Sequence, residues 1–159
     1  MPVQDVIQDP ASLTLTVIAT YPAPVARVFR VWAEPALLGK WWGPPGWPAT
    51  FLSYTLEVGG RAHYFMQGPD GTRHYGGWAF TAVDAPHALA FDDYFADAEG
   101  TPNRDLPGTS VGVTLVARDG GTTMTLVSRF GSLEQMEQLV AMGMVDGIRA
   151  AAGQIDALL

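Results

Sequence analysis

The C-terminal stretch Ser132–Leu159, SLEQMEQLVAMGMVDGIRAAAGQIDALL, decides the fold. Its apolar residues follow one another at steps of three or four, which places their side chains on one face of a helix. Ser132 can cap the first turn with Gln135 as its capping-box partner, and Glu134 complements the positive end of the helix dipole. We predict one long helix with an apolar stripe formed by Leu133, Met136, Val140, Met144, Ile148, Ala151, Ile155 and Leu158.

This helix would be about 40 Å long, enough to cross a small domain. Gly143, Gly147 and Gly153 lie inside it, and each costs about 1 kcal/mol relative to alanine. Gly143 and Gly147 share a face, so they indicate either close backbone packing on a sheet or space for a ligand. We favour close packing.

Composition limits what the protein can be. The chain has 159 residues, of which 48% are hydrophobic, enough for one domain with a single core. A net charge of −7, with Lys40 as the only lysine, makes nucleic acid and anionic membranes unexpected partners. The absence of cysteine excludes disulfides, thiolate catalysis and cysteine-ligated metals. The N-terminus does not resemble a secretory leader, and no apolar run approaches 18 residues. We therefore expect a cytoplasmic protein without membrane insertion.

The chain before the helix is rich in strands. We expect a single domain over 1–159 with a flexible lead at 1–11. Alternating apolar and β-branched residues predict strands at 13–20, 49–58, 61–68, 74–83, 87–95, 109–118 and 122–130. In the strand at 49–58, Leu52, Tyr54 and Leu56 would share one face. Two short amphipathic helices, at 25–32 and 35–42, separate the first two strands, and Gly43-Pro44-Pro45-Gly46 ends the second helix.

Turn residues connect the later strands into hairpins. If Val83 pairs with Ala88 across the Asp84-Ala85-Pro86 turn, then Phe80 lies opposite Phe91 and Trp78 lies opposite Asp93. The segment 96–108 is polar and is expected to be a mobile loop. The last hairpin turns at Asp119-Gly120-Gly121, and its core face would hold Val111, Val113, Leu115, Met124, Leu126 and Ser128.

These elements predict an α+β protein in which a curved antiparallel sheet of about seven strands wraps around the long C-terminal helix, a helix-grip fold. Two short helices follow the first strand. No internal repeat or low-complexity tract appears.

Several motifs resemble one known family along nearly the whole chain, from Leu13 to Leu159. They are Val28-Phe29-Arg30-Val31-Trp32, Lys40-Trp41-Trp42-Gly43-Pro44-Pro45-Gly46, Gly59-Gly60-Arg61 and Gly68-Pro69-Asp70-Gly71. They are similar to the Hsp90 ATPase activator homologue family of the START-like, Bet v 1-like superfamily. The resemblance implies a sheet that grips the terminal helix around an interior cavity, with helices at one mouth. The superfamily includes lipid carriers, hormone receptors and polyketide cyclases, so the resemblance implies no single activity.

Large side chains are concentrated on the faces expected to surround this cavity. Apolar concave sites with a few polar groups are typical of small-molecule pockets, and methionine adapts to varied ligand shapes. Packing in a solid core is the alternative. The candidate ligand-binding residues are Trp32, Trp41 and Trp42 at the mouth, Tyr54, Tyr64, Met66, Trp78, Phe80, Phe91 and Asp93 on the sheet, and Met136, Val140 and Met144 on the helix.

Two polar residues on the inward face are weak catalytic candidates. Asp93 lies among apolar neighbours, where burial would raise its pKa and suit it to proton transfer or ligand anchoring. His74 lies on the same face of its predicted strand as Trp78, and its side chain can reach the mouth of the cavity as a proton-transfer group. Asp93 at a solvated strand end and His74 at the surface are the alternatives.

Other charged residues give weaker signals. Arg61 and Arg129 can bind an anionic head group or form salt bridges, and we favour salt bridges in so acidic a chain. No His, Asp or Glu grouping has metal-ligand spacing, no nucleophile elbow or phosphate loop is present, and no cofactor is expected.

Three functions remain open from the sequence. The favoured one is a module that binds a small hydrophobic or amphipathic molecule in an interior cavity. The second is an enzyme of the polyketide cyclase or hydrolase kind, in which Asp93, His74 or Tyr64 polarises a bound substrate. The third is a chaperone-linked interaction module that uses the acidic segment 92–105 or a homodimer interface.

Overall fold

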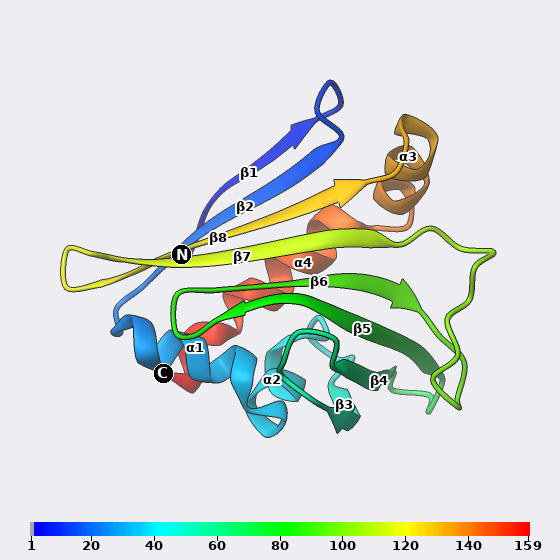
Figure 1. Ribbon diagram of the computed structural model, residues 1–159, viewed down its shortest axis with the longest axis horizontal. Coiled ribbons are helices and arrows are strands. Elements are labelled where there is room, and N and C mark those ends of the chain that lie inside the picture. Colours follow the sequence, from blue (N-terminus) through cyan, green and yellow to red (C-terminus); the bar gives the residue numbers. More distant parts are fainter. Residues whose placement is uncertain (1) are drawn as a thin grey trace.

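A computed structural model describes residues 2–159, and its architecture is an antiparallel sheet with helices on one side (Figure 1). The sheet has eight strands in the order β1-β2-β8-β7-β6-β5-β4-β3. The elements in chain order are β1 Val3–Asp9, β2 Thr14–Tyr21, α1 Val25–Ala33, α2 Pro35–Trp41, β3 Ala49–Tyr54, β4 Arg61–Gln67, β5 Arg73–Asp84, β6 Ala88–Phe95, β7 Thr109–Arg118, β8 Gly121–Phe130, α3 Leu133–Ala141, α4 Met144–Gly153 and a short 3-10 helix, Ile155–Leu158. The helix-grip prediction is confirmed.

The N-terminal segment differs from the expected flexible lead. Residues from Val3 onward form β1, which pairs antiparallel with β2 and adds an eighth strand to the predicted seven. An irregularity between Val3 and Asp5 allows Val3 and Val6, three residues apart, both to pack against the core. That spacing breaks the strict alternation by which a strand is identified in a sequence. Met1 lies outside the described residues.

The last hairpin forms as predicted. Its loop is Asp119-Gly120, with φ angles of 51° and 79°, and Arg118 pairs with Gly121. Two consecutive positive φ angles are the requirement of a type I′ turn, whose twist matches that of the flanking strands. The predicted core face, including Val113 and Leu126, is fully buried.

The predicted β5–β6 register is confirmed for two central residue pairs. Phe80 pairs with Phe91 and Trp78 pairs with Asp93. At the turn, however, Val83 pairs with Leu89 rather than with Ala88. An irregularity between Phe80 and Ala82 absorbs this difference of one residue, so the central pairs keep the predicted alignment.

The β3 prediction was partly wrong. The strand ends at Tyr54, not at Val58, and its register shifts between Phe51 and Ser53. Leu52 therefore points outward with 54% of its surface exposed, while Phe51 packs against the core. A bulge inserts one residue into a strand and reverses the face of those that follow.

The predicted single C-terminal helix is wrong, because it is broken between α3 and α4. The start is as expected, since the Ser132 Oγ accepts a hydrogen bond from the backbone N–H of Gln135 at 3.2 Å. The break is at Gly143, whose φ of 91° lies in the left-handed region that favours glycine. Leu133, placed on the predicted apolar stripe, is 48% exposed.

Two long-range interactions fix α4 against the rest of the domain. The Tyr21 hydroxyl donates to the carbonyl oxygen of Ala152 at 2.9 Å, joining β2 to α4. The Gln154 side-chain amide donates to the carbonyl oxygens of Trp41 and Gly43, at 3.2 and 2.8 Å. In Figure 1, α4 crosses behind the strands and brings the C-terminus next to α1.

Among residues 2–159, no helix combines the length and apolar composition that crossing a bilayer requires.

The glycine break gives a paired stability prediction. Gly143→Ala should lower the free energy of unfolding by about 1–2 kcal/mol, because alanine is strained in the left-handed region. Gly147→Ala should raise it by about 1 kcal/mol, because a Cβ there meets no atom within 4 Å and alanine favours the helix. Urea denaturation of both variants measures the difference. Equal stabilisation by the two substitutions would contradict the break at Gly143.

Candidate functional site

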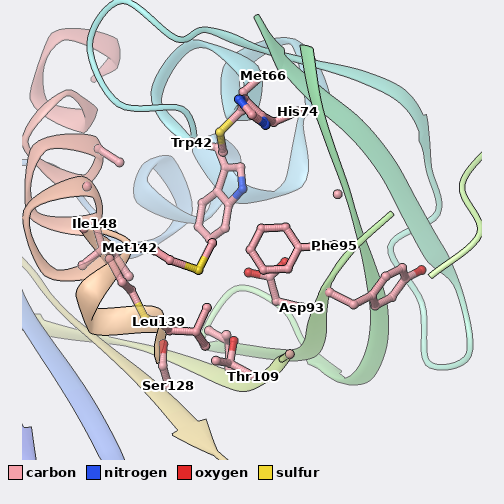
Figure 2. Close-up of a pocket in the computed structure, with 18 of the residues that line it drawn as sticks. Trp42, Met66, His74, Asp93, Phe95, Thr109, Ser128, Leu139, Met142 and Ile148 are labelled. Carbon is pink, nitrogen blue, oxygen red and sulfur yellow. The ribbon is translucent and has the colours of Figure 1, made fainter. Parts of the chain in front are cut away.

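A cavity of about 340 Å³ lies between the concave face of the sheet and the α3–α4 segment. Its strand wall includes Asp93 and Thr109, and its helical wall includes Leu139, Met142 and Ile148 (Figure 2). Pro107 and Gly108, at the end of the loop before β7, also line it. The walls are largely apolar with a few polar groups, the usual character of a small-molecule site.

The helix break contributes directly to this space. Gly143 and Gly147 both line the cavity, and a Cβ at either position would meet no atom within 4 Å. Close packing of the backbone on the sheet was therefore the wrong interpretation of these glycines. Their missing side chains leave room at the helical wall.

The structure divides the predicted site residues into two groups. The first group lines the cavity. It comprises Trp42 after α2, Tyr64 and Met66 on β4, His74 on β5, Asp93 on β6 and Met144 on α4.

The second group lies away from the cavity, because it packs into a solid core. Trp32, Trp78 and Phe91 are completely buried, and the rings of Trp78 and Phe91 stack with centroids 3.9 Å apart. Aromatic pairs of this kind fill an interior rather than enclose a space. The same group includes Trp41, Tyr54, Phe80, Met136 and Val140.

Sequence reasoning did not select several residues that line the cavity. Ser128 was placed on the core face of β8 but not in the site, although a serine among Met124 and Leu126 is the signal that could have found it. Thr109, Met142 and the Pro107-Gly108 pair gave no comparable signal.

Asp93 and Tyr64 form the main polar pair of the site. The Tyr64 hydroxyl donates to Asp93 Oδ1 at 3.4 Å, a long hydrogen bond. Burial raises the pKa of the Asp93 carboxyl to about 7, although the Tyr64 hydroxyl, the Trp78 indole N–H and the Tyr94 backbone N–H act to lower it. Burial and the nearby Asp93 charge raise the pKa of Tyr64 well above its ordinary value.

Two further polar groups at the cavity have no partner of regular hydrogen-bond geometry. They are the Ser128 Oγ and the Trp42 indole N–H, and both atoms are buried. Ser128 itself is only 1% exposed. Buried polar groups are nearly always hydrogen-bonded in native proteins, so these two atoms are exceptions among the described residues, as are the indole nitrogens of Trp32 and Trp78 in the core.

The charge of the wall is asymmetric. Among the described residues that line the cavity there is no lysine or arginine; Asp93 is the acidic member and His74 the histidine. The His74 ring lies 5.2 Å from that of Trp47, centroid to centroid.

Arg61 and Arg129 are exposed and lie outside the cavity wall. Within residues 2–159 the ion pairs are Arg30–Glu34 and Arg118–Asp119, so the salt bridges expected of Arg61 and Arg129 do not form. The described part of the chain also contains no group of three His, Asp or Glu residues arranged to hold a metal ion.

Comparison with solved structures gives close matches from bacteria. Protein Ms6760 from Mycobacterium smegmatis is 47% identical, with 99% of this chain and 97% of that chain covered and a TM-score of 0.92. A protein from Arthrobacter aurescens is 45% identical, with coverage of 97% and 90% and a TM-score of 0.93. A third, from Staphylococcus epidermidis, is 26% identical, with coverage of 98% and 93% and a TM-score of 0.84.

A search of curated proteins finds no match. The family model described as activator of Hsp90 ATPase homolog 1-like protein matches residues 22–159. That match covers all of the helices and every strand after β2, and it agrees with the resemblance carried by the tryptophan and glycine motifs. The chain belongs to the activator of Hsp90 ATPase homolog 1-like family.

Proposed function

We propose that this protein binds one small apolar or amphipathic molecule in the cavity between the sheet and α3–α4. The observation that carries the proposal is the cavity itself, a space of about 340 Å³ with largely apolar walls and with the Asp93–Tyr64 pair at its strand wall. A helix-grip fold of this family is typical of ligand-binding and polyketide cyclase-like proteins.

The volume limits the size of the ligand. At about 30 Å³ for each water-sized group, the cavity holds about a dozen non-hydrogen atoms. It lies at the small end of the usual range for ligand pockets. A medium-chain alcohol or a compound with two fused rings therefore fits within it.

Acid–base catalysis on the bound molecule is the second candidate function. It is favoured by one observation, a carboxyl group with a pKa of about 7 beside a tyrosine hydroxyl at the cavity wall. Such a group can take up or release a proton at neutral pH, which is what general acid–base catalysis requires. Asp93 would transfer the proton, and Tyr64 would orient the carboxyl.

Filling part of the cavity should weaken ligand binding. In Gly147→Leu the new side chain projects into the open space at the helical wall. We expect octan-1-ol, measured by isothermal titration calorimetry, to bind the variant at least about tenfold more weakly than the native protein.

Gly153→Leu is the matched control, because Gly153 lies on the same helix, is exposed and does not line the cavity. Octan-1-ol should bind this variant as it binds the native protein. Equal binding to the Gly147→Leu protein, with its fold intact by circular dichroism, would contradict binding in this cavity.

The raised pKa of Asp93 predicts a pH-dependent stability. The folded protein keeps the Asp93 proton up to about pH 7, whereas an unfolded chain releases it near about pH 3.9. Stability therefore falls as the pH rises from about 4 to about 7, because the folded state binds the extra proton. Asp93→Asn cannot ionise, so it should melt at a higher temperature than the native protein at pH 8.5 and at a similar temperature at pH 4.5.

Thermal denaturation at the two pH values measures this difference. Asp92→Asn is the control for the loss of a carboxyl group, since Asp92 is exposed on the same strand and lies outside the cavity wall. A lower melting temperature of Asp93→Asn at pH 8.5 would show instead that the cavity stabilises the ionised carboxylate.

A further inference from the structure

We propose that the cavity selects a ligand whose head group donates hydrogen bonds and carries no negative charge, an amine or a hydroxyl, and that this head group docks on the Asp93 carboxyl. The inference rests on the proposed function, because it assigns the chemical class of the molecule bound in the same cavity. It follows from the position of Asp93 and from the charges of the cavity wall.

The first step is the position of Asp93. Its strand is internal to the sheet, with Trp78 opposite it on β5 and Thr109 opposite it on β7. Its side chain points into the cavity (Figure 2). A carboxylate has about four lone-pair sites. The Tyr64 hydroxyl donates to it at 3.4 Å, and the Trp78 indole N–H and the Tyr94 backbone N–H also lie beside it, so about one site is left. The carboxyl group therefore has unused capacity to accept a hydrogen bond from a ligand.

The second step is the absence of a counter-charge. Among the described lining residues none is lysine or arginine, and neither the Arg30–Glu34 nor the Arg118–Asp119 ion pair involves Asp93. A buried anion without a cationic partner is strongly disfavoured. A carboxylate or phosphate head group would lie in an apolar wall beside a second negative charge, whereas an ammonium group would pair with Asp93.

The third step is the position of the ligand's apolar tail. The helical wall opposite the strands includes Leu139, Met144 and Ile148, together with the open space at Gly147. Methionine adapts to chains of different shape, and none of these side chains carries a charge. A ligand with its head at Asp93 therefore directs its apolar part toward α4.

The fourth step concerns pH, because the charge of Asp93 changes near neutrality. The titratable groups around Asp93 are Tyr64 on β4, His74 and Tyr75 on β5 and Tyr94 on β6; Thr109 on β7 is uncharged. No charged residue of α3 or α4 lines the cavity. Since the pKa of Asp93 is about 7, it is mostly neutral at pH 5.5 and mostly ionised at pH 8.5.

The experiment compares three ligands that differ in the head group and share an eight-carbon chain: octylamine, octan-1-ol and octanoate. Isothermal titration calorimetry of the intact protein at pH 8.5 should give the order octylamine, octan-1-ol, octanoate, with octylamine at least about tenfold tighter than octanoate. At pH 5.5 the preference for octylamine should shrink to about threefold or less, because Asp93 is then neutral.

Variants assign the effect to one carboxyl group. Asp93→Asn should remove the preference at pH 8.5 by weakening octylamine and strengthening octanoate. Asp92→Asn carries the same charge change on the outer face of β6, where Asp92 accepts a hydrogen bond from Ser110 at 2.8 Å, and should keep the native preference. His74→Gln should retain the pH dependence, which excludes His74 as its source.

The outcomes separate this inference from the proposed function. Octanoate binding as tightly as octylamine at pH 8.5, or an unchanged preference in Asp93→Asn, would overturn the head-group selection while leaving ligand binding in place. A failure of all three compounds to bind would overturn both.

Discussion

The packing of Trp78 on Phe91 divides the interior of this domain into a solid half and a hollow half. Both rings are completely buried, and Trp32 packs against each of them. This aromatic cluster joins α1 and the Trp41-Trp42 turn to the middle of the sheet. Because aromatic side chains bury large areas in specific geometry, these contacts stabilise the packing of the first two helices on the sheet. The cavity begins where the cluster ends, at Trp42, Tyr64 and Asp93.

The hollow half depends on the broken terminal helix. Its first part, α3, packs against Leu15 and Phe130 at one end of the sheet through Met136 and Leu139. Its second part, α4, is fixed at the other end by the Tyr21 hydroxyl. Between these two anchors, Gly143 and Gly147 present no side chains to the sheet, so the space under them remains open. The polar groups at the strand wall, Asp93 and Tyr64, line that space.

The sequence predicted the fold well because most elements have a strong local signal. Alternation predicted the inner strands. The Trp78–Asp93 pairing was also predicted correctly, although the turn register used for it was one residue off and the irregularity after Phe80 restored the alignment. The errors in predicting β1 and β3 share a physical cause. Irregularities near Val3 and Phe51 shift the alternation of inward and outward side chains by one residue. A glycine within a helix is equally ambiguous, because only the backbone angle of Gly143 distinguishes a break from close packing. The alternation of side chains along each strand identified those that point inward. It could not show that Phe80 fills the core whereas Tyr64 lines the cavity.

The most direct test of a hollow interior is a crystal structure of the protein under xenon pressure. Xenon binds in apolar cavities without needing a specific head group. The account predicts a xenon site bounded by Leu126, Met144 and Ile148, beneath the open space at Gly147. A structure in which Trp42, Met142 and Met144 close onto the sheet and leave no xenon there would contradict the account.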